Sequence, residues 1–169
     1  MEISITSIKE LREQCGAGIM DCRNALIKAE GDMEKALEDL REAGCLKAAK
    51  KMERATEQGL IESYIHVGGR IGAMIEVNCE TDFVARTDVF KELAHNLAMQ
   101  VAAMCPQYIS DEDIPEGTEV EDTETACLLK QAYIKDQAIT IQDVIVEAIA
   151  RLGENIRISR FTRFELGVR

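Results

Sequence analysis

The sequence predicts an α+β fold, with three short helices followed by an antiparallel sheet and at least two covering helices. Three observations support this prediction. Apolar residues recur at helical spacing between glycine-containing corners in the first 44 residues. From Ile61 to Val77 the period changes to two, interrupted by Gly68-Gly69. From Thr87 onward the helical period returns, and strand character reappears from Ile156 to Leu166.

The first 44 residues are expected to form a compact three-helix bundle. Thr6 or Ser7 is a suitable cap for the first helix, Asp32 caps the third, and Gly44 is expected to end it. The expected buried faces follow helical spacing and consist of Ile8, Leu11 and Cys15, then Ile19, Cys22, Leu26 and Ala29, then Met33, Ala36, Leu37 and Leu40.

Residues 45–58 are expected to be a basic connecting helix that ends before Gly59, because residues 45–55 hold three lysines and one arginine but a single acid, Glu53. The remaining residues, 59–169, are expected to form the α+β core domain. Its residues 111–124 hold eight carboxylates and no lysine or arginine, which is typical of an acidic, solvated linker.

Two alternating runs joined by Gly68-Gly69 predict a β-hairpin, with His66 in the same phase as polar Glu62 and therefore exposed. Thr87 is expected to cap a long helix that Pro106 closes. Residues 127–134 are a weaker strand candidate. Thr140 and Asp143 form a capping box for a further helix that ends at Gly153. A slip of apolar phase between Ile158 and Phe161 predicts a bulge in the last strand.

Composition excludes several classes of protein. The net charge of -11 disfavours direct binding to nucleic acid, which draws on clustered basic residues. No apolar run is long enough to span a membrane, and the N-terminus has no signal-peptide pattern, so a cytoplasmic location is expected. The six cysteines form no CxxC pair, which indicates reduced, mostly structural thiols.

Five segments, in order, resemble signatures of the elongation factor Ts family. The most specific is Glu76 to Arg86, with the sequence EVNCETDFVAR. The others are residues 11–22, 47–51, 149–156 and 163–167. One conservative departure is Ile19, where the family often has methionine. A second is that longer members carry two core subdomains, whereas this chain has one and its connecting insertion is shortened to the acidic linker.

The resemblance implies a function and a fold. The helices of residues 1–44 would be a ubiquitin-associated-like module. The chain would be a guanine-nucleotide exchange factor that binds elongation factor Tu, in GDP-bound and nucleotide-free forms, and promotes GDP release during translation elongation. It would not be an enzyme and would need no cofactor or metal. A second copy of the chain would replace the missing subdomain, giving a homodimer.

The resemblance also implies contact residues. Asp82 and Phe83, with their neighbours Thr81 and Val84, match the family segment that meets the GTPase domain of the partner. Phe83 is one of only seven aromatic residues, and it stands in a polar connection after a strand. The structural alternative is that Phe83 packs beneath the hairpin, as most phenylalanines are buried. Further candidates are Arg12, Met20 and Arg23 in the N-terminal module, and Tyr64, His66 and Arg70 at the hairpin.

Two other functions stay open on the sequence. Cys79, with Glu80, Asp82 and His95, is a weak candidate for a cysteine–histidine enzyme site. Alternatively, the three-helix module is a non-catalytic adaptor for another protein. The chain has no GxxxxGK[ST] phosphate loop, so binding of GTP by the chain itself is not expected.

Overall fold

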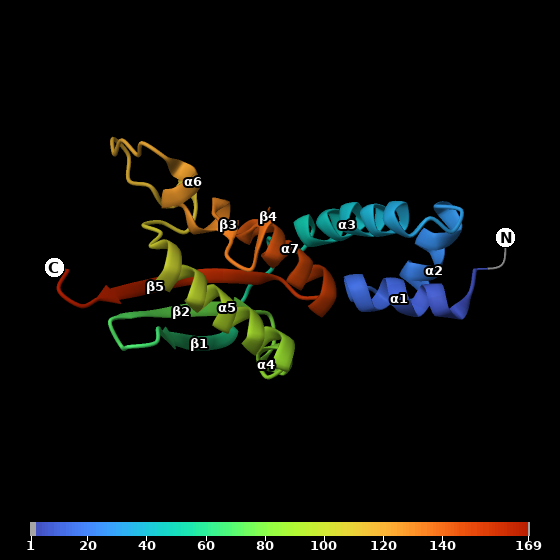
Figure 1. Cartoon of the computed structure of the whole chain (residues 1–169), viewed down its shortest axis with the longest axis horizontal. Coiled ribbons are helices and arrows are strands. Elements are labelled where there is room, and N and C mark those ends of the chain that lie inside the picture. The colour runs from blue at the N-terminus through green and yellow to red at the C-terminus, as the bar shows by residue number, and fades with distance from the viewer. Residues whose placement is uncertain (1–2, 169) are drawn as a thin grey trace. The chain divides into compact units, whose positions relative to one another are not determined.

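The computed structural model describes residues 3–168, apart from the side chains of Cys45 and Lys47. The chain divides into two compact units. The helical unit contains the residues up to Glu53 together with Val146–Gly153, and the sheet unit contains Arg54–Ile145 and the residues from Glu154 onward. The described fold is α+β, as the sequence predicted (Figure 1).

The helical unit begins with α1 (Ile5–Cys15), α2 (Ile19–Lys28) and α3 (Met33–Ala49). The N-cap of α1 is Ser4, whose Oγ accepts a bond of 3.0 Å from the Ser7 amide, so the prediction of Thr6 or Ser7 as cap was wrong. Asp32 caps α3 as predicted, accepting bonds from the amides of Glu34 and Lys35. Gly16, with φ of +66°, ends α1 in a left-handed conformation that glycine adopts without steric cost.

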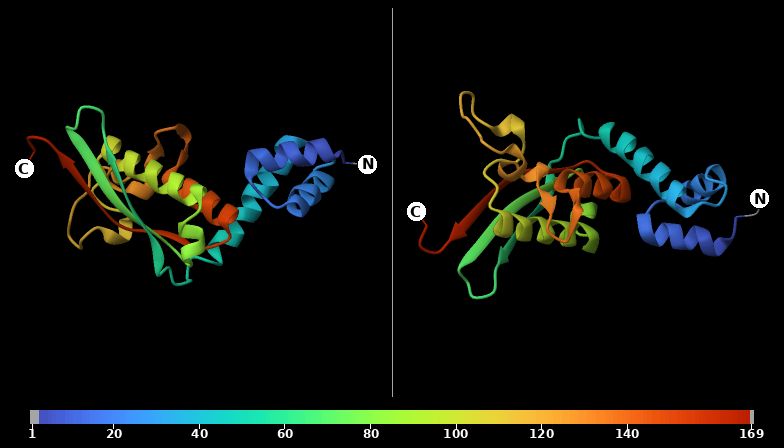
Figure 2. Two further views of the ribbon diagram at one scale, coloured as in Figure 1. Left: turned by 90° about the horizontal axis from the view of Figure 1, so that it is seen from below. Right: turned by 45° about the horizontal axis from the view of Figure 1, so that its top comes forward.

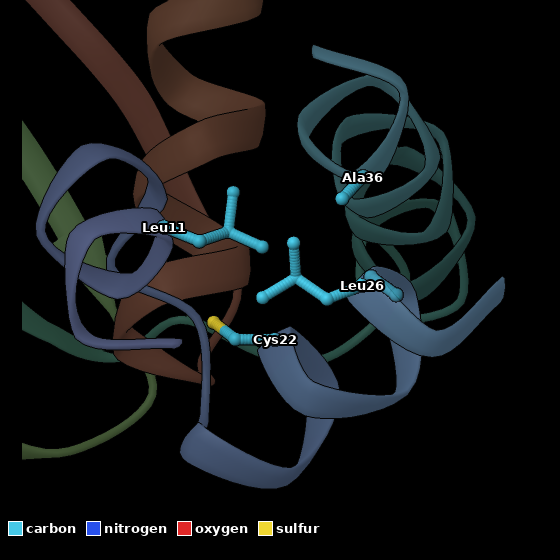
Figure 3. Packing of buried hydrophobic residues seen from close by; sticks show 5 residues of the cluster. Leu11, Cys22, Leu26 and Ala36 are labelled. Carbon is cyan, nitrogen blue, oxygen red and sulfur yellow. The ribbon is translucent and has the colours of Figure 1, made fainter. Parts of the chain in front are cut away.

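The core of the helical unit is made of small and medium side chains. Figure 3 shows Leu11, Cys22, Leu26 and Ala36 pointing toward one another from the three helices. Ile8, Cys15, Met33, Leu37 and Leu40 pack around them, which confirms most of the predicted buried faces. Ile19 is the exception, because it is exposed at the first position of α2.

α3 passes through Gly44 and ends at Ala49, so the predictions of a stop at Gly44 and of a separate helix over 45–58 were both wrong. A Cβ atom at position 44 would lie 3.3 Å from the Cβ of Ala150, within the same unit. Gly44 therefore permits a close approach of two helices instead of ending one. After Ala49 the chain turns, and the Lys51 Nζ donates a 2.7 Å bond to the Gly153 carbonyl.

The sheet unit contains a three-stranded antiparallel sheet, in the order β1 (Gln58–Ile65), β2 (Ile71–Cys79), β5 (Ile156–Glu165). β1 and β2 form the predicted hairpin. Glu76 pairs with Arg160 and Val77 with Ile158, so Ser159 is the extra residue of the predicted bulge. The helix α5 (Asp88–Met104) packs against all three strands and crosses one face of the sheet (Figure 2).

α5 begins at the predicted cap, where Thr87 Oγ1 accepts a 3.2 Å bond from the Phe90 amide. The buried residues of its inner face include the predicted Phe90, Leu93, Leu97 and Val101, but Met104 is partly exposed. The helix ends at Met104, with Cys105 as its left-handed cap before Pro106.

Short elements join α5 to the last strand. They are η1 (Asp111–Asp113), α6 (Thr123–Ala126), η2 (Leu128–Lys130), β3 (Ala132–Tyr133) and β4 (Asp136–Thr140). The predicted strand over 127–134 was therefore mostly wrong, and β4 was missed. α7 (Ile141–Leu152) follows, with the predicted capping box, since Asp143 accepts bonds from the Thr140 amide and hydroxyl.

Candidate partner-binding surface

The turn after β2 holds the central candidate residues, in the short helix α4 (Asp82–Ala85). Thr81 is its N-cap, with its Oγ1 3.5 Å from the Val84 amide. The Thr81 amide and hydroxyl also donate to the Glu154 carboxylate, over 2.9 and 2.6 Å. These two bonds join residues that lie 73 positions apart in the sequence, so the start of α4 is tied to a residue two positions before the last strand.

The other end of α4 is also held. Asp82 forms an ion pair of 2.9 Å with Arg86, one turn later. Thr87 Oγ1 donates a 2.8 Å bond to the Val84 carbonyl. Ala85, the last residue of the helix, is buried. The residues on both sides of Phe83 thus have fixed backbone or side-chain partners.

Phe83 projects from this fixed turn and is 79% exposed. The alternative in which it packs beneath the hairpin is therefore excluded. An exposed aromatic ring leaves apolar area in water, which costs about 25 cal/mol per Å² until another surface covers it. A rigid, exposed ring on a short helix has the chemistry of a contact residue for a partner protein.

Glu80, just before this turn, connects the segments that flank the strands in a second network within the sheet unit. Its Oε1 accepts a 2.6 Å bond from the Asn155 amide and lies 3.5 Å from the Arg54 guanidinium. The Asn155 side chain donates to the Arg54 carbonyl over 2.8 Å. The sequence indicated no role for Glu154 or Asn155, whose partners lie more than seventy residues away.

The cysteine–histidine alternative finds no support in the geometry. Cys79 is buried, and its thiol donates to the Thr81 carbonyl over 3.1 Å. Burial, followed by the nearby charge of Glu154, raises the pKa of Cys79, whereas a nucleophilic cysteine needs a lowered pKa. His95 instead lies 3.5 Å from Glu62 and packs edge-on against Tyr64.

The hairpin candidates lie at the other end of β1 from the α4 turn, because Gln58 pairs with Cys79 while Ile65 pairs with Gly72. The Tyr64 hydroxyl lies 3.1 Å from His66 Nδ1. His66 is exposed, as predicted, and Arg70 is exposed in the hairpin loop. Tyr64 is half-buried, since its ring also contacts His95.

The remaining candidates belong to the helical unit. Arg12 lies on α1, while Met20 and Arg23 lie on the first turns of α2, and all three are exposed. Met20 is not a core residue, because it is 60% exposed. Ile19 beside it is exposed as well, and sequence reasoning missed it by assigning it to the buried face.

A further apolar surface was also missed because the two faces of β1 are reversed from the expectation. Glu62 and Tyr64 face α5, through their contacts with His95. The opposite face, here called the open sheet face, carries four exposed apolar side chains from three strands: Ile61, Ile65, Met74 and Phe164. The Ile65 side chain lies over Gly72, where an added Cβ would be 2.6 Å from its Cδ1.

Two negative findings apply to residues 3–168. Within this range, no group of three or more His, Cys, Asp or Glu residues could hold a metal ion. None of the helices in the described part of the chain is both long enough and apolar enough to cross a membrane.

Comparisons with known proteins give a consistent result. A family model described as Elongation factor TS matches residues 19–125. A protein named Elongation factor Ts from Thermotoga neapolitana is 50% identical over 194 residues, which cover 99% of this chain and 98% of that protein. Similar proteins of the same name come from Fervidobacterium nodosum, 47% identical over 99% of this chain and all of that protein, and Rippkaea orientalis, 49% identical over 98% and 79%. The matched length of 194 residues exceeds the 169 residues of this chain, so these relatives contain residues with no counterpart here.

Proposed function

Because the chain belongs to the elongation factor Ts family, we propose that it binds elongation factor Tu and promotes the release of GDP during translation elongation. The observation that carries the proposal is Phe83, an exposed ring on a turn held at both ends. We place this activity in the cytoplasm, with the translation machinery.

Exchange needs no nucleophile and no proton transfer. The factor must bind the nucleotide-free GTPase more tightly than the GDP-bound form. Coupling between two ligands of one protein is reciprocal, so the factor weakens GDP binding as much as GDP weakens its own binding. An inserted ring can deliver this coupling if its contact is compatible only with a distorted nucleotide pocket. The turn that carries Phe83 must then resist being pushed back, and the Thr81–Glu154 bonds supply that resistance.

The other candidate residues extend the proposed contact. Asp82 orients the turn through its ion pair with Arg86, and both charges remain partly exposed to a partner. Arg12, Met20 and Arg23 supply a second contact from the helical unit. Tyr64, His66 and Arg70 supply a third at the hairpin, away from the α4 turn. No ligand of the chain other than a protein is part of the proposal.

The test is a release assay with elongation factor Tu carrying a fluorescent GDP. Wild-type protein should accelerate loss of the fluorescent nucleotide when unlabelled GDP is in excess. An adaptor would bind the GTPase, as measured by co-sedimentation, without changing that rate. Binding without acceleration would therefore reject exchange and favour the adaptor.

We also propose that the chain forms a homodimer through the open sheet face. One face of the three-stranded sheet is covered by α5, and the other exposes Ile61, Ile65, Met74 and Phe164. On this face, Glu76 of β2 and Arg160 of β5 form an ion pair of 2.7 Å, so their charges neutralise each other. Two copies of an apolar, self-neutralised sheet can pack face to face about a two-fold axis.

Sedimentation velocity of wild type and Phe164→Asp tests the dimer. The substitution places a charge in the proposed apolar contact, so the variant should sediment as a monomer at concentrations where wild type is dimeric. Leu46→Asp introduces the same charge at an exposed position on α3 and should leave the dimer intact. A monomeric wild type with full exchange activity would reject the proposal.

A further inference from the structure

Two cysteines of the helical unit are in contact. Cys15 is the last residue of α1 and Cys22 lies in the first turns of α2, and their Sγ atoms are 3.9 Å apart. Cys22 is fully buried, whereas Cys15 is partly exposed. The Cys22 thiol also donates to the Ala17 carbonyl over 3.8 Å. The thiols of Cys79 and Cys127 bond to oxygen atoms elsewhere in the chain, and Cys105 is exposed.

We propose that Cys15 and Cys22 form a reversible, oxidation-sensitive dithiol site, whose disulfide changes the α1–α2 corner that carries Arg12, Met20 and Arg23. The chemical site stands on the sulfur contact alone. Its effect on exchange rests on the proposed function. In a reducing compartment, a disulfide of this kind is transient and serves as a sensor instead of a structural link.

The reaction with a low-molecular-weight disulfide proceeds in two steps. The Cys15 thiolate attacks one sulfur of the small disulfide, a mixed disulfide forms, and one small thiolate leaves. The Cys22 thiolate then attacks the Cys15 sulfur, the protein disulfide forms, and the second small thiolate leaves. The protein loses two electrons and two protons, and the small disulfide becomes two thiols.

The order of these steps follows from accessibility. Cys15 is the thiol that a small disulfide can reach, while Cys22 lies in the core with Leu11 and Leu26. Burial, with Cys15 as the next contribution, raises the pKa of Cys22 to about 11, so Cys22 is a poor first attacker. Once Cys15 carries the mixed disulfide, its sulfur is the electrophile already beside Cys22.

Closing the bond must bring the two sulfur atoms together, by rotation of the side chains and by movement of the chain segments that carry them. A disulfide has its sulfurs about 2.05 Å apart, so the present separation has to shrink by nearly half. The three residues after Cys15 are Gly16, Ala17 and Gly18, and Gly16 already has a left-handed conformation. This corner can take up the movement, and Met20 and Arg23 lie directly beyond it on α2.

The sequence around the pair makes the experiment direct. Arg12 and Arg23 flank it, so trypsin releases residues 13–23 as one peptide containing both cysteines. The full chain is incubated with oxidised glutathione, and the remaining thiols are blocked with N-ethylmaleimide. The chain is then digested with trypsin, and the mass of the peptide is measured by mass spectrometry. We expect a peptide that has lost two hydrogens and binds no maleimide, and that regains both thiols after dithiothreitol.

Two variants control the chemistry. Cys105→Ser removes an exposed thiol outside the pair and should give the same closed peptide. Cys15→Ser leaves Cys22 without its partner, and this peptide should take up maleimide only after denaturation. A wild-type peptide that ends as a stable glutathione adduct at Cys15, or that keeps both thiols, would overturn the dithiol site.

The effect on function is measured separately. GDP release from elongation factor Tu is compared for reduced and closed protein, and the closed form should be several-fold slower until it is reduced. Equal rates would overturn the coupling to the contact corner. If the reduced protein itself fails to accelerate release, the proposed function fails, while the peptide masses still decide the dithiol chemistry.

Discussion

The two units support their exposed apolar side chains by different means. In the sheet unit, Phe83 stands on a single helical turn that is held by directed bonds, from Glu154 at its start and from Thr87 at its end. In the helical unit, Met20 lies on α2, which packs against a core of small and medium side chains. The N-cap of α2 is Gly18, which makes no side-chain hydrogen bond. One support is polar and local, and the other depends on packing.

This difference has a physical consequence. A hydrogen bond to a charged group contributes about 1.5–3 kcal/mol and fixes direction as well as distance. Packing of alanine, cysteine and leucine holds helices together but allows small relative shifts, because each contact is weak and non-directional. The α4 turn can therefore hold its contact residue in one position against a partner. The α1–α2 corner can shift slightly to fit the partner's surface.

The largest effect is expected when the aromatic ring of Phe83 is removed, because this abolishes the contact of the α4 turn and leaves that of the helical unit intact. Phe83→Ala should weaken association with nucleotide-free elongation factor Tu by about 2 kcal/mol, or about thirtyfold, because an exposed ring on a fixed support has the features of a hot spot. The same variant should slow GDP release while keeping the wild-type melting temperature. Binding is measured by titration and release by stopped-flow fluorescence.

A matched control for Phe83 comes from the same unit. Leu166→Ala truncates a side chain that is 64% exposed but has no proposed role. It should leave both affinity and release unchanged. Equal losses in the two variants would mean that exposed apolar area in general, and not the ring at position 83, drives binding.

The next effect acts on the support of the ring. Glu154→Ala removes the carboxylate that accepts both Thr81 bonds, so the free energy of unfolding should fall by about 1.5 kcal/mol. Exchange should fall as well, although Phe83 is intact. Denaturant unfolding and the release assay measure the two effects. Glu154→Gln keeps one acceptor oxygen and should lie between wild type and alanine. A normal release rate in Glu154→Ala would contradict the need for a rigid turn.

The sequence revealed the elements with strong periodicity but not the direction in which they face. β2, α5 and α7 have long apolar phases, and the phase slip at Ser159 correctly predicted a bulge. Alternation in β1 was also correct, yet its apolar phase is the exposed one. A period of two identifies two faces, and only the position of α5 decides which of them is covered.

The misplaced boundaries and residues have similar causes. Gly44 was predicted to end a helix because glycine often does so. Its actual role is to allow the close approach of Ala150, which belongs to a remote segment of the sequence and could not be foreseen. β4 has five residues, too few for a clear period. The support that Glu154 gives to the Phe83 turn could not be predicted from the neighbourhood of either residue, because Glu154 and its partner Thr81 lie 73 residues apart in the sequence.

A smaller effect is expected at the packed corner. Met20→Ala should weaken association by about 1 kcal/mol, or about fivefold, because an adjustable contact carries less energy than a fixed ring. Ile27→Ala truncates a half-exposed side chain at the other end of the same helix and should have no effect. Titration against nucleotide-free elongation factor Tu provides the comparison. A loss for Met20→Ala as large as that for Phe83→Ala would remove the distinction between the two supports.

The smallest effect tests the packing of the helical unit through pH. Burial raises the pKa of Cys22 from 9.0 to about 11, so the folded state holds the thiol proton more tightly than the unfolded state. The stabilisation is fully present below pH 9 and is lost as the pH rises toward 11. Between pH 8 and pH 9.5, linkage gives a loss of about 0.8 kcal/mol.

Cys22→Ala is the control for this titration, because it keeps a small apolar group but cannot ionise. Its unfolding free energy starts lower, from the lost packing with Leu11 and Leu26, yet should fall less steeply over the same range. Chemical denaturation at each pH, under reducing conditions, measures both slopes. Equal slopes of unfolding free energy against pH for the two proteins would mean that the Cys22 thiol is not desolvated. Water would then reach the core of the helical unit at the α1–α2 corner.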